Sequence, residues 1–182
     1  MTSKYILPIF LGFYVLSLVF GAFYLQGRLV VNTDAFFYVL PELHVMGESF
    51  RHGLLPLWNP NIVCGVPLLA NGQSACFYPP TWLVTCYPKS MVFVALLHEV
   101  LALIGFYLWL RRQALTLLGS FLGAVKFSCS GEMASLFEFH SHQAVMAYVP
   151  FIFLSAQDAF EKRRMGDWLK LTFFLFLQQR AR

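Results

Sequence analysis

Residues 53–80 read GLLPLWNPNIVCGVPLLANGQSACFYPP and form the stretch around which the rest of the chain is organised. They hold five of the nine prolines, three of the twelve glycines and an Asn-Gly pair, and they show neither helical nor strand periodicity. Flexible linkers are rich in Gly, Ser and charge, whereas this segment carries Leu, Trp, Val, Phe and Tyr. The sequence therefore predicts an ordered irregular loop that folds onto an apolar surface.

The composition of the whole chain is typical of a membrane protein. Of 182 residues, 58% are hydrophobic, 18% aromatic and only 12% charged, which is far from the average of soluble domains. The formal net charge is +4, but the basic residues gather at the ends of apolar runs and form no continuous stripe. That distribution argues against a nucleic-acid partner and indicates that these charges set membrane topology.

Five apolar runs are candidate membrane spans, at residues 5–25, 91–110, 114–130, 144–160 and 168–177. At 1.5 Å per residue, the first run is long enough to cross a hydrocarbon core of about 30 Å. A cleaved secretory signal is the alternative for this run, because Lys4 precedes it. The fifth run reaches only about half of that thickness. We therefore expect an incomplete last span, and a chain that is the N-terminal portion of a larger helical bundle.

Basic residues predict the orientation of these spans. The short flanks on one side of four crossings hold seven of them: Lys4, Arg111, Arg112, Lys162, Arg163, Arg164 and Lys170. The long loop 26–90 on the other side holds three: Arg28, Arg51 and Lys89. The positive-inside rule then places the N-terminus in the cytoplasm and the loop outside. The predicted fold is an all-α, polytopic membrane protein, one membrane domain over 1–182 with four to five transmembrane helices and a long ordered extracytoplasmic loop.

Within the loop, residues 41–52 predict a short amphipathic helix. One side carries Leu43, Met46 and Phe50, and the other carries Glu42, Glu48, Arg51 and His52. Pro41 suits a first helical turn, and Gly53 is a natural stop. A helix of this kind beside a membrane lies in the interface with its apolar face down.

Asp34 is the first candidate for chemistry, because it follows the first apolar run by nine residues. At the edge of a low-dielectric region this carboxyl group can act as a general base or as a metal ligand. A helix N-cap is the structural alternative.

A second group of candidates lies between the later runs. Glu138, His140 and His142 form one cluster, and on an extended backbone the spacing of the two histidines would put both imidazole rings on one side. The cluster is either a set of metal ligands or acid-base groups, or a solvated turn.

Lys126 lies inside an apolar run, where a charge costs about 2.5 to 3.5 kcal/mol near a helix centre. It is expected to face protein, water or a lipid phosphate, with His98 and Glu99 as candidate partners, or to snorkel outward.

The four cysteines carry no clear motif. Cys64 and Cys76 lie on the predicted oxidising side, and their spacing leaves a disulfide bridge open, whereas Cys86 and Cys129 are expected to be unpaired apolar fillers.

The loop resembles a known family. Residues 56–60 (PLWNP), 65–74 (GVPLLANGQS) and 77–79 (FYP) are similar to the signature loop of bacterial YfhO-type membrane proteins. Residues 128–133 (SCSGEM), the following histidines and the run that opens near Pro150 resemble the second outer turn and the fourth helix of the same family. That family in turn resembles the GT-C class of glycosyltransferases, which use a polyprenyl-phosphate sugar donor and an acidic residue in the first outer loop.

The resemblance implies an integral membrane glycosyltransferase of the bacterial cytoplasmic membrane. It would transfer a sugar from a polyprenyl-phosphate donor to an envelope polymer or lipid acceptor outside the cell. Asp34 matches the acidic position and would activate the acceptor hydroxyl or hold a divalent metal ion. The residues expected to bind substrate are Arg51, Trp58, Asn59, Asn71, Gln73, Tyr78, Lys126, His140 and His142. A transporter or flippase of lipid-linked precursors, or an inactive membrane remnant, are the alternatives.

Overall fold

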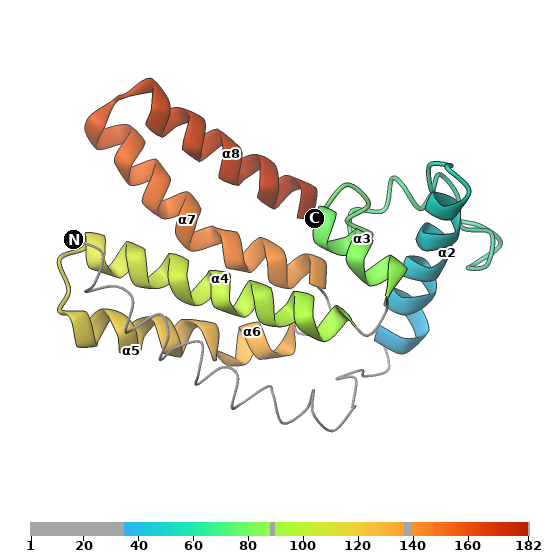
Figure 1. Ribbon diagram of the computed structural model, residues 1–182, viewed down its shortest axis with the longest axis horizontal. Coiled ribbons are helices and arrows are strands. Elements are labelled where there is room, and N and C mark those ends of the chain that lie inside the picture. Colours follow the sequence, from blue (N-terminus) through green and yellow to red (C-terminus); the bar gives the residue numbers. More distant parts are fainter. Residues whose placement is uncertain (1–34, 88–89, 137–139, 182) are drawn as a thin grey trace.

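The computed structural model describes residues 35–87, 90–136 and 140–181, and every regular element in that part of the chain is a helix (Figure 1). The prediction of an all-helical fold is confirmed for these residues. In chain order the elements are the π-helical turn η1 (Ala35–Val39), α2 (Leu40–Arg51), α3 (Pro79–Cys86), α4 (Ser90–Arg112), α5 (Leu117–Ser128), α6 (Gly131–Ser135), α7 (His140–Lys162) and α8 (Met165–Ala181).

Four helices lie side by side in the order α5, α4, α7, α8 (Figure 1). Helix α4 packs against both α5 and α7, and α8 packs against α7. Small buried residues allow close approach: Ala102 of α4 and Ala147 of α7 are fully buried in one cluster. At Gly105 of α4, an added Cβ would lie only 2.6 Å from the ring of Phe151 in α7. The absence of a side chain at this position therefore sets the distance between the two central helices.

Helices α4 and α7 run in the same direction, and their C-terminal ends are tied together. Arg112 of α4 pairs with Asp158 at 3.4 Å and with Glu161, both on α7. Gln113 donates to Gln157 at 2.7 Å. Since α5 begins and α8 begins beside these ends, six basic residues gather at this end of the bundle: Arg111, Arg112, Lys162, Arg163, Arg164 and Lys170 (Figure 1).

The opposite end of the bundle carries η1, α2, α3 and the loop between α2 and α3 (Figure 1). The predicted loop helix is confirmed as α2, with Pro41 in its first turn and Gly53 beyond its end at φ +68°. Helix α3 was not predicted. It begins at Pro79 and Pro80, whose fixed φ and missing N–H groups suit the first turn of a helix.

The loop is ordered by its own hydrogen bonds, as predicted. Asn59 and Val66 exchange backbone hydrogen bonds of 2.8 and 2.9 Å, which close a short turn. Gly65 has φ +109°, and a Cβ there would meet the Trp58 indole at 2.6 Å. Leu68 is fully buried in the cluster that also contains Leu43 and Met46. Several of its large side chains do not contribute to this apolar contact and are exposed: Leu54, Leu55, Leu57, Trp58, Val63 and Phe77.

One helix of the described part, α4, is both long enough and apolar enough to cross a membrane, with a mean hydropathy of 2.2 over its best window. It contains the predicted span 91–110. The predicted span 114–130 is instead the twelve-residue helix α5 followed by α6, and 144–160 and 168–177 lie within α7 and α8. The predicted span 5–25 lies outside the described residues.

The polar face expected for α2 is wrong at one position. Glu42 is only 4% exposed and lies on the buried side with Leu43 and Met46, whereas Glu48 and Arg51 form an ion pair on the exposed side. Tertiary contacts with the loop, and not the helix pattern, decide this burial.

Candidate functional site

A cavity with a volume of about 600 Å³, called the main cavity below, lies where the loop meets the ends of α7 and α8. Its lining is rich in amide and hydroxyl groups: Asn71, Gly72, Gln73, Ser141, His142, Val145, Gln178 and Gln179. These residues come from three segments that are far apart in sequence. Its volume lies in the range of about 300 to 1,000 Å³ that small-molecule sites occupy.

Asn71 fixes the loop wall of this cavity. Its Nδ2 donates to both carboxylate oxygens of Glu42, at 3.0 and 3.1 Å, and lies 3.0 Å from the hydroxyl of Tyr38. Its Oδ1 accepts from the backbone N–H of Gln73 at 3.1 Å, and its carbonyl oxygen accepts from the hydroxyl of Ser74 at 2.8 Å. Asn favours such local bonds in turns, so one side chain both shapes the turn and ties it to α2.

Tyr78 anchors the end of the loop in the bundle. Its hydroxyl lies 2.6 Å from Nε2 of His98 on α4 and 2.8 Å from the hydroxyl of Tyr148 on α7. All three side chains are buried. Burial and the neighbouring Tyr148 raise the pKa of Tyr78, so it keeps its proton at neutral pH and donates one of these bonds. Tyr78 therefore holds the loop wall of the cavity at a fixed distance from the α7 wall.

The α8 wall carries the positive charge of the site. The guanidinium of Arg180 lies over the rings of Phe77 and Phe176, 5.2 and 4.9 Å from their centroids. Such cation–π contacts orient the group and leave its N–H donors available. Among the described residues, no carboxylate forms an ion pair with Arg180. It lines a smaller cavity of about 260 Å³, which shares Asn71, Gly72 and Gln179 with the main one.

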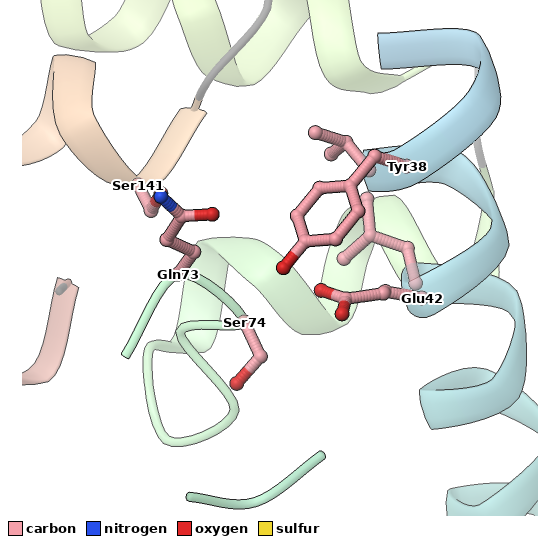
Figure 2. A pocket seen from close by; sticks show the side chains of 7 residues that line it. Tyr38, Glu42, Gln73, Ser74 and Ser141 are labelled. Carbon is pink, nitrogen blue, oxygen red and sulfur yellow. The ribbon is translucent and has the colours of Figure 1, made fainter. Parts of the chain in front are cut away.

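A third, water-sized space lies between the loop and α2. It has about 10 Å³, and its polar lining consists of Tyr38, Glu42, Gln73, Ser74 and Ser141. Figure 2 shows the carboxylate of Glu42 and the hydroxyl of Tyr38 pointing into the same space, with Gln73 and Ser141 across from them. Burial raises the pKa of Glu42, and hydrogen bonds from Asn71 and Tyr38 offset part of that effect.

Three of the residues expected to bind substrate come together in this arrangement. Asn71, Gln73 and His142 line the main cavity, although 71 residues separate Asn71 from His142. Tyr78 lies beneath the loop wall and acts on the cavity through the hydrogen bonds described above.

Other predicted site residues lie elsewhere. Arg51 pairs with Glu48 on the exposed side of α2. Trp58 and Asn59 build the turn of the loop, where Oδ1 of Asn59 accepts from the N–H of Asn61 at 3.0 Å. Lys126 is exposed near the end of α5. Its expected partners His98 and Glu99 contact Tyr78 and Gln143 instead.

The extended backbone that a ligand pair at residues 140 and 142 would need is not present, because both residues belong to the first turn of α7. Glu138 and Asp34 lie outside the described residues, as does the side chain of His140. The described residues contain no group of three or more His, Cys, Asp or Glu side chains that could hold a metal ion.

The cysteines of the described loop and bundle are all free thiols, so the bridge left open between Cys64 and Cys76 is not formed. Cys76 is buried beside Ser74, 3.1 Å from its hydroxyl, whereas Cys64, Cys86 and Cys129 are exposed.

Sequence reasoning missed several site residues: Glu42, Ser141, Gln178, Gln179 and Arg180. Glu42 and Ser141 gave no local signal, because each fits the polar face of a helix. The pair Gln178-Gln179 before Arg180 did give one, since three polar residues interrupt an apolar run. In the sequence alone these residues indicate only where the apolar run ends.

No family model, no curated protein and no solved structure matches the chain. The geometry of the site therefore carries the functional conclusion. Amides and hydroxyls that can each donate and accept, beside one guanidinium, suit a ligand that combines several hydroxyl groups with an anionic group.

Proposed function

We propose that the protein is a membrane glycosyltransferase that moves a sugar from a polyprenyl-phosphate donor to a hydroxyl of an envelope acceptor on the extracytoplasmic side. The observation that carries this proposal is the amide-lined cavity beside Arg180, at the end of the bundle opposite the basic residues. The resemblance of the loop to YfhO-type proteins points to the same chemistry.

The bundle fits a lipid environment. Helix α4 has 23 residues and therefore reaches about 34 Å, which matches a hydrocarbon core of about 30 Å. Its neighbours expose large apolar side chains, among them Leu118 and Leu122 of α5 and Leu169, Phe173 and Phe176 of α8. In water such a surface would be unusual for a monomer, whereas lipid tails or further helices would cover it. In this polytopic arrangement the basic end faces the cytoplasm.

The amide groups and the guanidinium of the site would have different roles in this reaction. The amides of Asn71, Gln73, Gln178 and Gln179 would bind sugar hydroxyls, since an amide both donates and accepts. The guanidinium of Arg180 would pair with the phosphate of the donor, and would stabilise the charge that develops there as the sugar leaves. Arg180 takes the role expected of Arg51 and Lys126, which do not line the cavity. Asp34 keeps its proposed role at the acceptor hydroxyl or a divalent metal ion.

The test uses the whole chain in liposomes with labelled polyprenyl-phosphate sugars and an envelope acceptor. Gly72→Leu is the diagnostic variant, because a Cβ at Gly72 meets nothing within 4 Å and its side chain would extend from the cavity lining without straining the fold. We expect transfer to fall at least about tenfold, since a misplaced substrate loses much of its orientation. Gly166→Leu is the matched control, because Gly166 is equally open but lies at the far end of the bundle.

Two results would contradict the proposal: no transfer by the wild-type chain with any donor, or equal transfer by the Gly72 and Gly166 variants. Asp34→Asn separately tests the carboxylate, and undiminished transfer by that variant would remove the role proposed for Asp34.

Transport of a lipid-linked precursor is the second candidate, and one observation favours it. Glu99 of α4 and Gln143 of α7 are fully buried and hydrogen-bonded at 3.2 Å, and an ionisable side chain inside a membrane span often marks a transport path. Scrambling of a labelled lipid by the purified protein without any acceptor would support transport. Transfer without scrambling would support the enzyme.

A further inference from the structure

We propose that Glu42 is a proton acceptor of this site, and that it takes a proton from a hydroxyl group in the main cavity through one bound water molecule. The inference rests on the proposed function. It assigns the proton of the acceptor hydroxyl to Glu42, and of the two roles proposed for Asp34 it keeps the binding of a divalent metal ion.

The water-sized space against Glu42 adjoins the main cavity, because two residues line both. The water-sized space against Glu42 and the main cavity are both lined by Gln73 and Ser141. A space of about 10 Å³ is close to what one water molecule needs, and such a water is held by two to four polar partners. The hydroxyl of Tyr38, the amide of Gln73 and the carboxylate of Glu42 provide such partners (Figure 2). A base acts well through a single intervening water.

The surroundings of Glu42 suit a base. The groups that face its carboxylate are neutral donors, Asn71 of the loop and Tyr38 of η1. The thiol of Cys76 lies close enough that the negative charge of Glu42 contributes to raising the pKa of that thiol. Among the described residues, no basic side chain forms an ion pair with it. A buried carboxylate without a cationic partner binds a proton more readily than an exposed one, which agrees with its raised pKa.

The geometry also limits where Glu42 can act. It is only 4% exposed and held from one side by Asn71, so direct contact with a bulky acceptor is blocked and the water-sized space is its open side. A residue whose role is only to hold Asn71 would need no ionisable group. A structural role and a proton-accepting role of Glu42 can therefore be distinguished by a substitution that removes the ionisable group.

The proposed step balances as follows. The O–H bond of the acceptor hydroxyl breaks, its proton passes to the water, and the water gives one of its protons to the carboxylate of Glu42. The hydroxyl oxygen forms a bond to the anomeric carbon of the sugar. The bond from that carbon to the phosphate oxygen breaks, and its electron pair leaves with the polyprenyl phosphate. Glu42 then returns its proton to solvent.

The experiment compares Glu42→Gln with Glu48→Gln, its matched control on the exposed side of the same helix. Sugar transfer is measured from acidic to alkaline pH with labelled polyprenyl-phosphate sugar. Because the base must be unprotonated, wild-type transfer should fall as pH drops through the raised pKa of Glu42. Glu42→Gln should slow transfer at least about 100-fold at neutral pH and lose that acidic limb, whereas Glu48→Gln should keep both.

A second measurement needs no turnover. The carboxyl band that wild type shows in its infrared spectrum and Glu42→Gln lacks should titrate reversibly above the usual range of Glu. If wild type transfers sugar but Glu42→Gln keeps the same rate and pH profile, the role of Glu42 is overturned and the proposed function stands. If wild type transfers nothing, the proposed function fails, and the band decides whether Glu42 accepts a proton from solvent. A band that does not titrate overturns the inference.

Discussion

At the residue scale, the site depends on a few side chains that each make two connections. Asn71 joins the loop to Glu42 and Tyr38 with its amide and shapes its own turn with its oxygens. Tyr78 joins the same loop to α4 and α7. Replacing either residue removes a hydrogen bond from a buried partner, and a buried polar group left unpaired costs about 1 to 3 kcal/mol.

Tyr78→Phe tests this directly. The substitution removes one hydroxyl and keeps the ring, so both His98 and Tyr148 lose a partner at 2.6 and 2.8 Å. We expect the free energy of unfolding in detergent to fall by about 1 to 3 kcal/mol. Tyr87→Phe is the control, since Tyr87 is 61% exposed, and it should leave the unfolding transition unchanged. Equal stability of the two variants would show that the Tyr78 hydroxyl does not anchor the loop.

At the element scale, the contact between α4 and α7 holds the two central helices in register. Gly105 lies under the ring of Phe151, and that ring is itself stacked on Phe174 of α8, with centroids 5.1 Å apart. Phe151 therefore has little freedom to move aside. One glycine thus controls the spacing of three helices.

Gly105→Ala should be destabilising although alanine favours helices more than glycine does. The new Cβ would lie 2.6 Å from a ring that is also stacked on Phe174, and overpacking of this kind costs about 1 to 3 kcal/mol. The gain in helix propensity offsets at most about 1 kcal/mol. Thermal unfolding measures the balance against Gly166→Ala, where a Cβ meets nothing within 4 Å. A Gly105→Ala protein as stable as this control would contradict the packing described for α4 and α7.

The sequence predicted the bounds of helix α2 correctly, but it predicted only in part which of its side chains are buried. Its bounds agree with the sequence because Pro41 and Gly53 act on the backbone locally. Its polar face does not agree at Glu42, because the partner Asn71 lies 29 residues further along the chain.

At the scale of the whole molecule, the two ends of the bundle have different chemistry. Six basic residues mark one end, and the loop with its cavities marks the other. If the bundle crosses a membrane, these ends lie in different compartments.

Cysteine labelling tests this arrangement. A variant that keeps only Cys64, which is exposed in the loop, should react with a membrane-impermeant maleimide in intact cells. Gln113→Cys in a background without other cysteines should react only after permeabilisation, because residue 113 lies between α4 and α5 at the basic end. We expect at least a tenfold difference in labelling, since a bilayer separates the two positions. Equal labelling of both would contradict a membrane crossing by α4.

Much of the secondary structure could be predicted from the sequence because it depends on neighbours along the chain. Apolar runs predicted the regions of α4, α7 and α8, and the turn residues predicted an irregular but ordered loop. Helix α3 was missed because its eight residues follow the loop without a periodic pattern, and only Pro79 and Pro80 mark its start.

By itself, the sequence determined that the described chain is helical, where α2 and α4 lie, and which loop residues are polar, because hydrophobic periodicity, proline and glycine act over a few residues. Only the tertiary structure decided that Gln178, Gln179 and Arg180 join Asn71 and Gln73 at one cavity, and that Glu42 is buried against it. The physical reason is that side-chain packing between α4, α7 and α8, and not any local preference, brings segments separated by about a hundred residues into contact.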